Sequence, residues 1–178
     1  MPSSALNDFL QNLNVVDEIL TAAPGPGRPR KGHAGAVVKG GLVHLTAALE
    51  AYVEALFEEA VAALWPGWTG ARYKKLFEST TERFHNAHQD NTNRLFFNIG
   101  LPWVVDRVSW HGFGNDRVKA LLLDTYKDRG AIAHGGTLAR LSLPKLRQRR
   151  DLIARYATEL DRVIALEIAA RTGGNVPW

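Results

Sequence analysis

Residues 36–64 read AVVKGGLVHLTAALEAYVEALFEEAVAAL, and this stretch decides the fold class. It contains no proline and is rich in alanine, leucine and glutamate, which favour helices. At about 1.5 Å of rise per residue, a helix of this length is roughly 43 Å long. We therefore expect one long helix that forms the spine of the domain. Gly40 and Gly41 near its start are the positions where this helix could bend or begin late.

Helical spacing also marks the segments on both sides of this stretch. Residues 3–22 begin with serines of the N-capping type and repeat apolar side chains at helical intervals. Residues 71–89 and 116–134 have the same periodicity, and residues 142–173 begin with a capping serine and a proline. No segment alternates like a β-strand. We expect one all-α domain over residues 1–178, a bundle of four to five main helices with an up-and-down core.

Two stretches interrupt the helical pattern. PGPGRPRKG, residues 24–32, contains three prolines and three glycines, so we expect a linker or mobile loop over residues 24–35. Residues 90–115 mix polar stretches with short apolar pieces. This mixture predicts an irregular helical insertion in the middle of the domain.

The composition excludes several functional classes. The chain has no cysteine, which excludes disulfides, zinc–thiolate sites and cysteine nucleophiles. Its N-terminus lacks the basic and apolar regions of a signal peptide, and no run approaches the roughly 18 apolar residues of a membrane span. We expect a cytoplasmic protein with no cofactor, no metal and no membrane partner.

Positive charge is concentrated in the second part of the chain. Residues 107–178 carry 13 lysines and arginines against 7 acidic residues, whereas residues 1–106 carry 9 against 11. This asymmetry favours a polyanionic partner, because neutralising phosphates releases counterions. The alternative is an ordinary solvated helix face, and the sequence does not decide between the two.

The stretch YKDRGAIAHGG, residues 126–136, holds the candidate chemistry. Arg129 and His134 lie five positions apart, and paired glycines follow as a helix stop. Five positions turn an ideal helix by about 140°, so the two side chains diverge. They can act together only if the helix end loosens or a second chain supplies one of them.

This stretch resembles the motif of the HEPN superfamily (higher eukaryotes and prokaryotes nucleotide-binding domain), in which an arginine precedes a histidine by four to six residues. LVHLTAALEAYVEALFEEA (residues 42–60) and NTNRLFFNIGLPWV (residues 91–104) look like the RiboL-PSP-type ribonuclease branch of that superfamily. The resemblance covers roughly residues 37–166. It departs at Gly130, because many active members carry a polar residue directly after the arginine.

The resemblance implies a metal-independent endoribonuclease. HEPN domains dimerise so that both copies of the motif face one cleft. A homodimer would use its two His134 side chains as acid and base, while its two Arg129 side chains hold the scissile phosphate. Many prokaryotic members are toxins restrained by an antitoxin or act in anti-phage defence, so the resemblance also implies a partner protein of that kind.

Several neighbouring residues are expected to support this site. Glu50 is either an inward partner of Arg129 or an exposed helix residue, and Asp128 cannot be assumed to replace the missing polar residue. Tyr126 either stacks on an RNA base or belongs to the core. The basic side chains that would guide RNA to the cleft are Lys127, Arg140, Lys145, Arg147, Arg149 and Arg150.

Two other interpretations remain open. Glu82 and His85, with Glu78 and His88 nearby, have the Glu-x-x-His spacing of di-iron carboxylate bundles, although the chain has no second such motif. The other interpretation is a non-catalytic HEPN module that binds nucleotides, RNA or a partner protein, and Gly130 favours it.

Overall fold

The computed structural model is built from helices, and the residues it describes contain no strand beyond a single bridge between Trp110 and Phe113. The described residues are 1–22, 33–67, 75, 79–81, 84–135 and 141–178. The expected all-α class is confirmed. Of the linker or mobile loop expected over residues 24–35, residues 24–32 lie outside the described residues, whereas residues 33–35 are helical and that part of the expectation is wrong.

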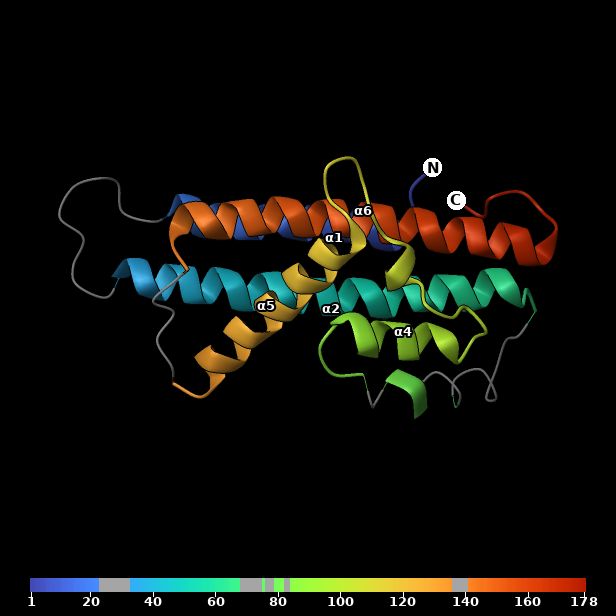
Figure 1. Cartoon of the computed structure of the whole chain (residues 1–178), viewed down its shortest axis with the longest axis horizontal. Helices are drawn as coiled ribbons and strands as arrows, with labels where there is room; N and C mark the ends of the chain where they lie inside the picture. The colour runs from blue at the N-terminus through green and yellow to red at the C-terminus, as the bar shows by residue number, and fades with distance from the viewer. Residues whose placement is uncertain (23–32, 68–74, 76–78, 82–83, 136–140) are drawn as a thin grey trace.

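Three long helices form the centre of the molecule: α1 (Ser4–Thr21), α2 (His33–Leu64) and α6 (Leu143–Thr172). They lie side by side, and α1 runs antiparallel to the other two (Figure 1). The helix α5 (Asn115–Ala133) runs obliquely back across α2, so the chain direction alternates along α1, α2, α5 and α6. The short helix α4 (Gln89–Phe97) lies across α2 from α6.

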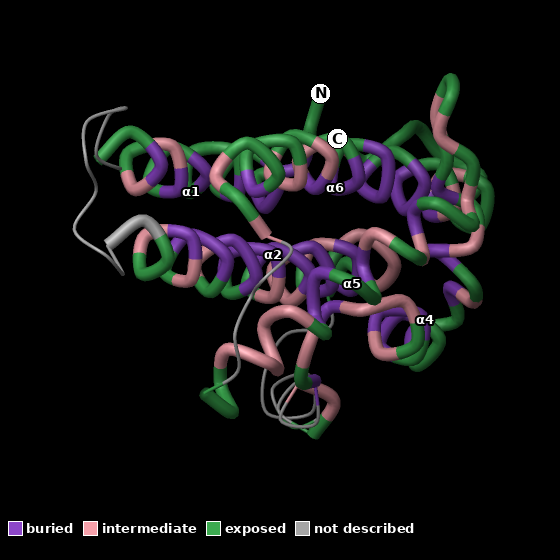
Figure 2. The backbone as a smooth tube through the Cα atoms, turned by 60° about the vertical axis from the view of Figure 1, so that its left-hand side comes forward, coloured by how far each residue is buried: buried purple, intermediate pink, exposed green. Residues whose placement is uncertain are grey.

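The core is the space between α1, α2 and α6, where each helix turns its apolar face inward. Figure 2 shows the buried residues on the faces that these helices present to one another. The buried residues Leu42, Leu45, Leu49, Val53 and Leu56 lie on α2, and none of them is exposed to solvent. A helix that is apolar on most of its surface needs such coverage on several sides.

The start of α1 is tied to both of its neighbours by carboxylates. Ser3 caps the helix by accepting a hydrogen bond from the Leu6 N–H at 3.0 Å, and its hydroxyl donates to Asp161 of α6. Glu59 of α2 accepts from the Ala5 N–H at 2.6 Å. These contacts satisfy N–H groups that a helix start leaves without a partner in its own helix.

The apolar character of α2 also bears on the expectation that the protein has no membrane partner. By length and composition alone, the stretch Gly35–Leu64 could cross a membrane, a test that the core helix of a soluble protein passes equally. Here its apolar side chains pack against α1, α5 and α6. The absence of a membrane partner and the cytoplasmic location stay predictions.

Two helices differ from their expected bounds. The helix α2 begins at His33, three residues before Ala36, and continues through Gly40 and Gly41 without delay. The helix expected over residues 71–89 does not reach its expected end: residues 84–88 are not helical, and Asn86 has a φ of 68°. The irregular middle segment contains α4 and a short 3₁₀ helix, Val105–Arg107.

The neighbouring glycines of α2 provide a test of the contact between α2 and α6. A Cβ at Gly41 would lie 2.9 Å from the Cδ2 of the fully buried Leu146, whereas a Cβ at Gly40 would meet nothing within 4 Å. We expect Gly40→Ala to raise the free energy of unfolding by about 0.5–1 kcal/mol, because alanine loses less backbone entropy in a helix. Gly41→Ala should be less stable than Gly40→Ala by about 1–3 kcal/mol because it overpacks the core. Denaturant unfolding measures both, and equal stabilisation would contradict the close contact.

Candidate functional site

Arg129 projects from α5 toward the segment that precedes α4. Its Nη1 donates to the Oδ1 of Asn86 at 3.0 Å, and its Nη2 lies 3.8 Å from the Oε2 of Glu50. The Arg129 side chain is 39% exposed. A guanidinium has five N–H donors, so these two contacts leave further donors for another anion.

Glu50 lies beside Arg129, as expected for an inward partner of the guanidinium. Burial raises the pKa of the Glu50 carboxyl above its ordinary value, and the charge of Arg129 and the Asn86 N–H offset this only in part. Its Oε1 is buried, and no described residue donates to it with ordinary hydrogen-bond geometry, although the Tyr126 hydroxyl lies close enough to lower the pKa of the carboxyl slightly. The ion pair is therefore a weak restraint on Arg129, because the two charged atoms are 3.8 Å apart and burial disfavours the charged form of the carboxyl.

Asn86 is the closest partner of Arg129 and was not identified from the sequence. Its φ of 68° is left-handed, a conformation that asparagine tolerates better than most residues. The side-chain amide of Asn91 donates to the carbonyl oxygen of Asn86 at 3.1 Å and also to that of His85. These hydrogen bonds hold the turn against α4, and the turn presents the Asn86 side chain to the guanidinium.

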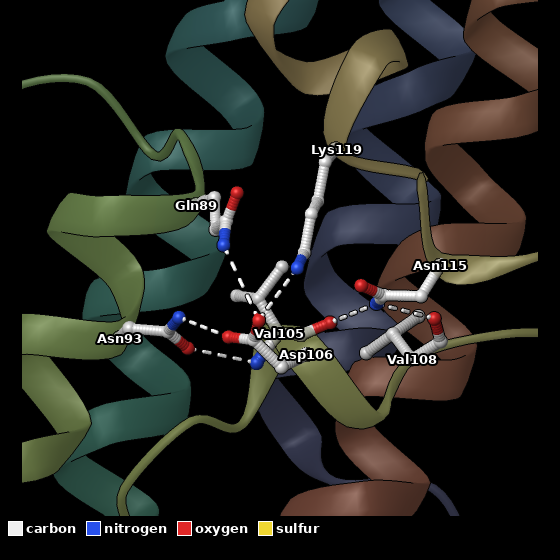
Figure 3. Close-up of polar contacts among 7 residues, drawn as sticks. All are labelled: Gln89, Asn93, Val105, Asp106, Val108, Asn115 and Lys119. Carbon is white, nitrogen blue, oxygen red and sulfur yellow. Dashed lines mark hydrogen bonds and ion pairs between the residues drawn. The ribbon is translucent and has the colours of Figure 1, made fainter. Parts of the chain in front are cut away.

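A polar network fixes α4 against the start of α5 (Figure 3). Asp106 of the 3₁₀ helix accepts from Asn93 at 2.6 Å and pairs with Lys119 of α5 at 2.6 Å. Burial by itself would raise the pKa of Asp106, but Lys119 and the amides of Asn93 and Gln89 outweigh it and lower the pKa. The network sets where the turn before α4 meets α5, and so where Asn86 meets Arg129.

Tyr126 belongs to the core, and its proposed stacking on an RNA base is wrong for this conformation. The residue is 8% exposed, and its ring packs edge-on against His88 with the centroids 6.3 Å apart. Glu50 of α2 lies near Tyr126, and little of the ring is open to solvent. Burial, followed by the charge of Glu50, raises the pKa of the Tyr126 hydroxyl well above its ordinary value.

His134 is exposed at the C-terminus of α5. Its backbone N–H donates to the carbonyl oxygen of Gly130 at 3.2 Å, and Gly135 follows with a φ of 74°, which provides the expected helix stop. Because α5 stays helical through Ala133, Arg129 and His134 of one chain point in directions that differ by about 140°. A Cβ at Gly130 would meet nothing within 4 Å, so the backbone leaves room there for a side chain.

Part of the expected RNA-guiding run is engaged within the molecule. Arg149 forms an ion pair with Asp128 at 2.7 Å and is only 16% exposed. Arg150 pairs with Asp17 of α1 at 2.6 Å and with Asp151 at 3.1 Å. Both arginines thus tie α6 to its neighbours α5 and α1, and the expectation that they guide RNA stays a prediction.

The other members of that set are placed differently. Arg147 is exposed and donates to the carbonyl oxygen of Leu20 at 3.3 Å. Lys127 and Lys145 are exposed, with no ion pair to any residue that the structure describes. Arg140 lies outside the described residues. Over the described part of the chain, the free positive charge close to the motif is thus smaller than the sequence suggested.

The Glu-x-x-His interpretation requires a helix over residues 82–88, and the described part of that segment, residues 84–88, is not helical. His85 and His88 lie in the non-helical segment before α4, while Glu78 and Glu82 fall outside the described residues. In the part of the chain that is described, no group of three or more histidine, aspartate or glutamate side chains is placed to hold a metal.

No family model matches the chain, and comparisons with curated proteins and with solved structures found no match. The resemblance to the HEPN superfamily therefore rests on the sequence motifs alone.

The left-handed turn at Asn86 can be tested by two substitutions that remove the same amide. Alanine resists a positive φ, so we expect Asn86→Ala to lower the free energy of unfolding by about 1–2 kcal/mol. Glycine adopts this conformation without strain, so Asn86→Gly should lower the free energy of unfolding by a smaller amount. Denaturant unfolding of the two variants separates the backbone from the side chain. Equal losses would assign the cost to the hydrogen bond with Arg129 instead.

The pKa of Glu50 predicts a pH-dependent stability. A raised pKa means that the folded protein binds the proton more tightly than the unfolded chain, so ionisation costs stability as the pH rises above the ordinary value of 4.5. Glu50→Gln cannot ionise, and it also removes a charge that adds to the raised pKa of Glu54. We expect the native protein to lose stability relative to Glu50→Gln as the pH rises from about 4 to about 7. Unfolding curves across this range measure it, and the opposite trend would mean that the ion pair with Arg129 dominates.

Proposed function

We propose that the protein is a metal-independent endoribonuclease of the HEPN type that acts as a homodimer. The observation that supports this best is the geometry of Arg129: Asn86 orients its guanidinium, and the side chain is still 39% exposed. His134 is exposed at the end of the same helix. The site therefore offers a phosphate-binding fork and a group that can transfer protons.

The proposed reaction uses the RNA as its own nucleophile. One histidine takes the proton of the ribose 2′-hydroxyl as its oxygen attacks the adjacent phosphorus. The bond from phosphorus to the 5′-oxygen breaks, and a second histidine donates a proton to that leaving oxygen. The products are a 2′,3′-cyclic phosphate and a 5′-hydroxyl. The Arg129 guanidinium stabilises the negative charge that develops on the phosphate oxygens.

Two copies of the chain are needed because one chain cannot assemble this centre. Arg129 and His134 diverge on a regular helix, and each chain supplies one copy of each. In a twofold dimer, the ends of the two α5 helices can face one another, so that a histidine from each chain approaches the same phosphate. In this proposal an antitoxin or a defence-system protein would restrain the nuclease.

A second candidate is a non-catalytic HEPN module that binds nucleotides, RNA or a partner protein. The observation that favours it is the pairing of Arg129 with Glu50, together with Gly130 at the position where many active members have a polar residue. In such a module Arg129 would bind a phosphate without any cleavage.

Cleavage of labelled RNA in the presence of EDTA tests the proposal. We expect His134→Ala to reduce the cleavage rate by about 10²–10⁴-fold, because it removes the acid–base group. Arg129→Lys should retain partial activity, since lysine keeps the charge but loses the planar fork. His111→Ala is the matched control, because this histidine is also exposed but lies outside the motif.

Two results would contradict a ribonuclease of this type: full activity of His134→Ala, or a strict requirement for Mg²⁺. The non-catalytic alternative predicts a third pattern. The native protein would bind RNA without cutting it, and Arg129→Ala would weaken that binding.

A further inference from the structure

A pocket of about 450 Å³ opens beside α4. Its volume falls within the range of about 300–1,000 Å³ that is typical of sites for small molecules. Its polar lining comes from Asn91 and Arg94 of α4, from Asn98 at the C-terminal cap of that helix, and from Ser79 and Thr80. None of the residues assigned to the proposed reaction lies in its wall, so the pocket is a separate feature.

The lining combines one positive charge with an apolar wall. Arg94 is exposed and forms no ion pair with any residue that the structure describes. Phe84 and Leu95 are buried and form the apolar part of the lining. A guanidinium flanked by amides suits a phosphate, while the apolar wall suits the flat face of a base or the edge of a sugar.

The pocket and Arg129 are connected through the turn before α4. Asn91, which lines the pocket, donates to the carbonyl oxygen of Asn86, and Asn86 accepts the hydrogen bond from Arg129. Asn91 therefore lines the pocket together with Arg94 and also holds the turn whose Asn86 side chain contacts Arg129, so the two arginines are linked through these contacts. A ligand that bridges them would carry at least two phosphates, as a nucleic acid strand does.

We propose that this pocket binds one nucleotide through its phosphate, next to the phosphate that Arg129 holds. The assignment of that nucleotide to an RNA strand rests on the proposed function. The binding chemistry of the pocket does not depend on it. Arg94 lies in the last turn of α4, where the helix dipole by itself disfavours an anion. The positive charge that binds the phosphate must therefore come from the Arg94 side chain.

Equilibrium binding of adenosine 5′-monophosphate tests the pocket without any cleavage. The parent is the full chain with His134→Ala, and adenosine serves as the ligand without a phosphate. We expect the monophosphate to bind about tenfold more tightly than adenosine, and Arg94→Ala to remove this advantage, as expected for one charge-assisted contact.

Arg155→Ala is the matched control for the loss of positive charge. Arg155 is exposed on α6, which lies across α2 from α4 (Figure 1), so its removal should leave binding unchanged. Asn98→Asp is a second variant, which places a negative charge in the pocket and should weaken binding of the monophosphate but not of adenosine. Circular dichroism reports whether each variant is folded.

The proposal is overturned if Arg94→Ala binds the monophosphate as tightly as the parent does. It is also overturned if Arg155→Ala causes an equal loss, because binding would then follow the total charge of the protein. Failure of the pocket and failure of the proposed function are distinguishable. The first appears in mononucleotide binding, and the second appears only in RNA cleavage by the native chain.

Discussion

The burial of α2 on several sides is the constraint on which the rest of the structure depends. Because α1, α5 and α6 must all cover this helix, the angle at which α5 crosses it is fixed by packing. Leu122 and Tyr126, one turn apart on α5, both point inward. Arg129 follows three positions later and emerges at the edge of the interface, beside Glu50 of α2. The place of the guanidinium is thus a consequence of core packing.

The two partners of Arg129 restrain it in different ways. Glu50 offers a charge, but its burial makes ionisation costly and the nearest oxygen is 3.8 Å away. Asn86 offers a neutral oxygen at 3.0 Å. A neutral acceptor orients a guanidinium without neutralising it, so the positive charge stays available to an incoming anion. This arrangement suits a phosphate-binding residue better than a closed carboxylate pair would.

The helical core could be predicted from the sequence because its signals are local. Ser3 caps α1, and a glycine in the left-handed conformation follows α5 and α6, all within short stretches of chain. The turn at Asn86 has no such signal, since neither glycine nor proline marks it. Its contact with Arg129 spans 43 positions and exists only once α4 is fixed against α5. The sequence therefore placed Arg129 on its helix but could not identify its closest partner.

The charged residues of α6 show a second limit of prediction from the sequence, because their partners are also distant along the chain. Their spacing suggested a basic face open to RNA, yet α1 and α5 bring Asp17 and Asp128 against Arg150 and Arg149. Charge counted along the chain overestimates the charge available for binding, because packing pairs opposite charges that are distant in sequence. Among the residues that the structure describes, a small number of separate cations remains near the motif. Affinity for a polyanion scales with the phosphates contacted, so such a surface favours recognition of one or two phosphates over binding along a long strand.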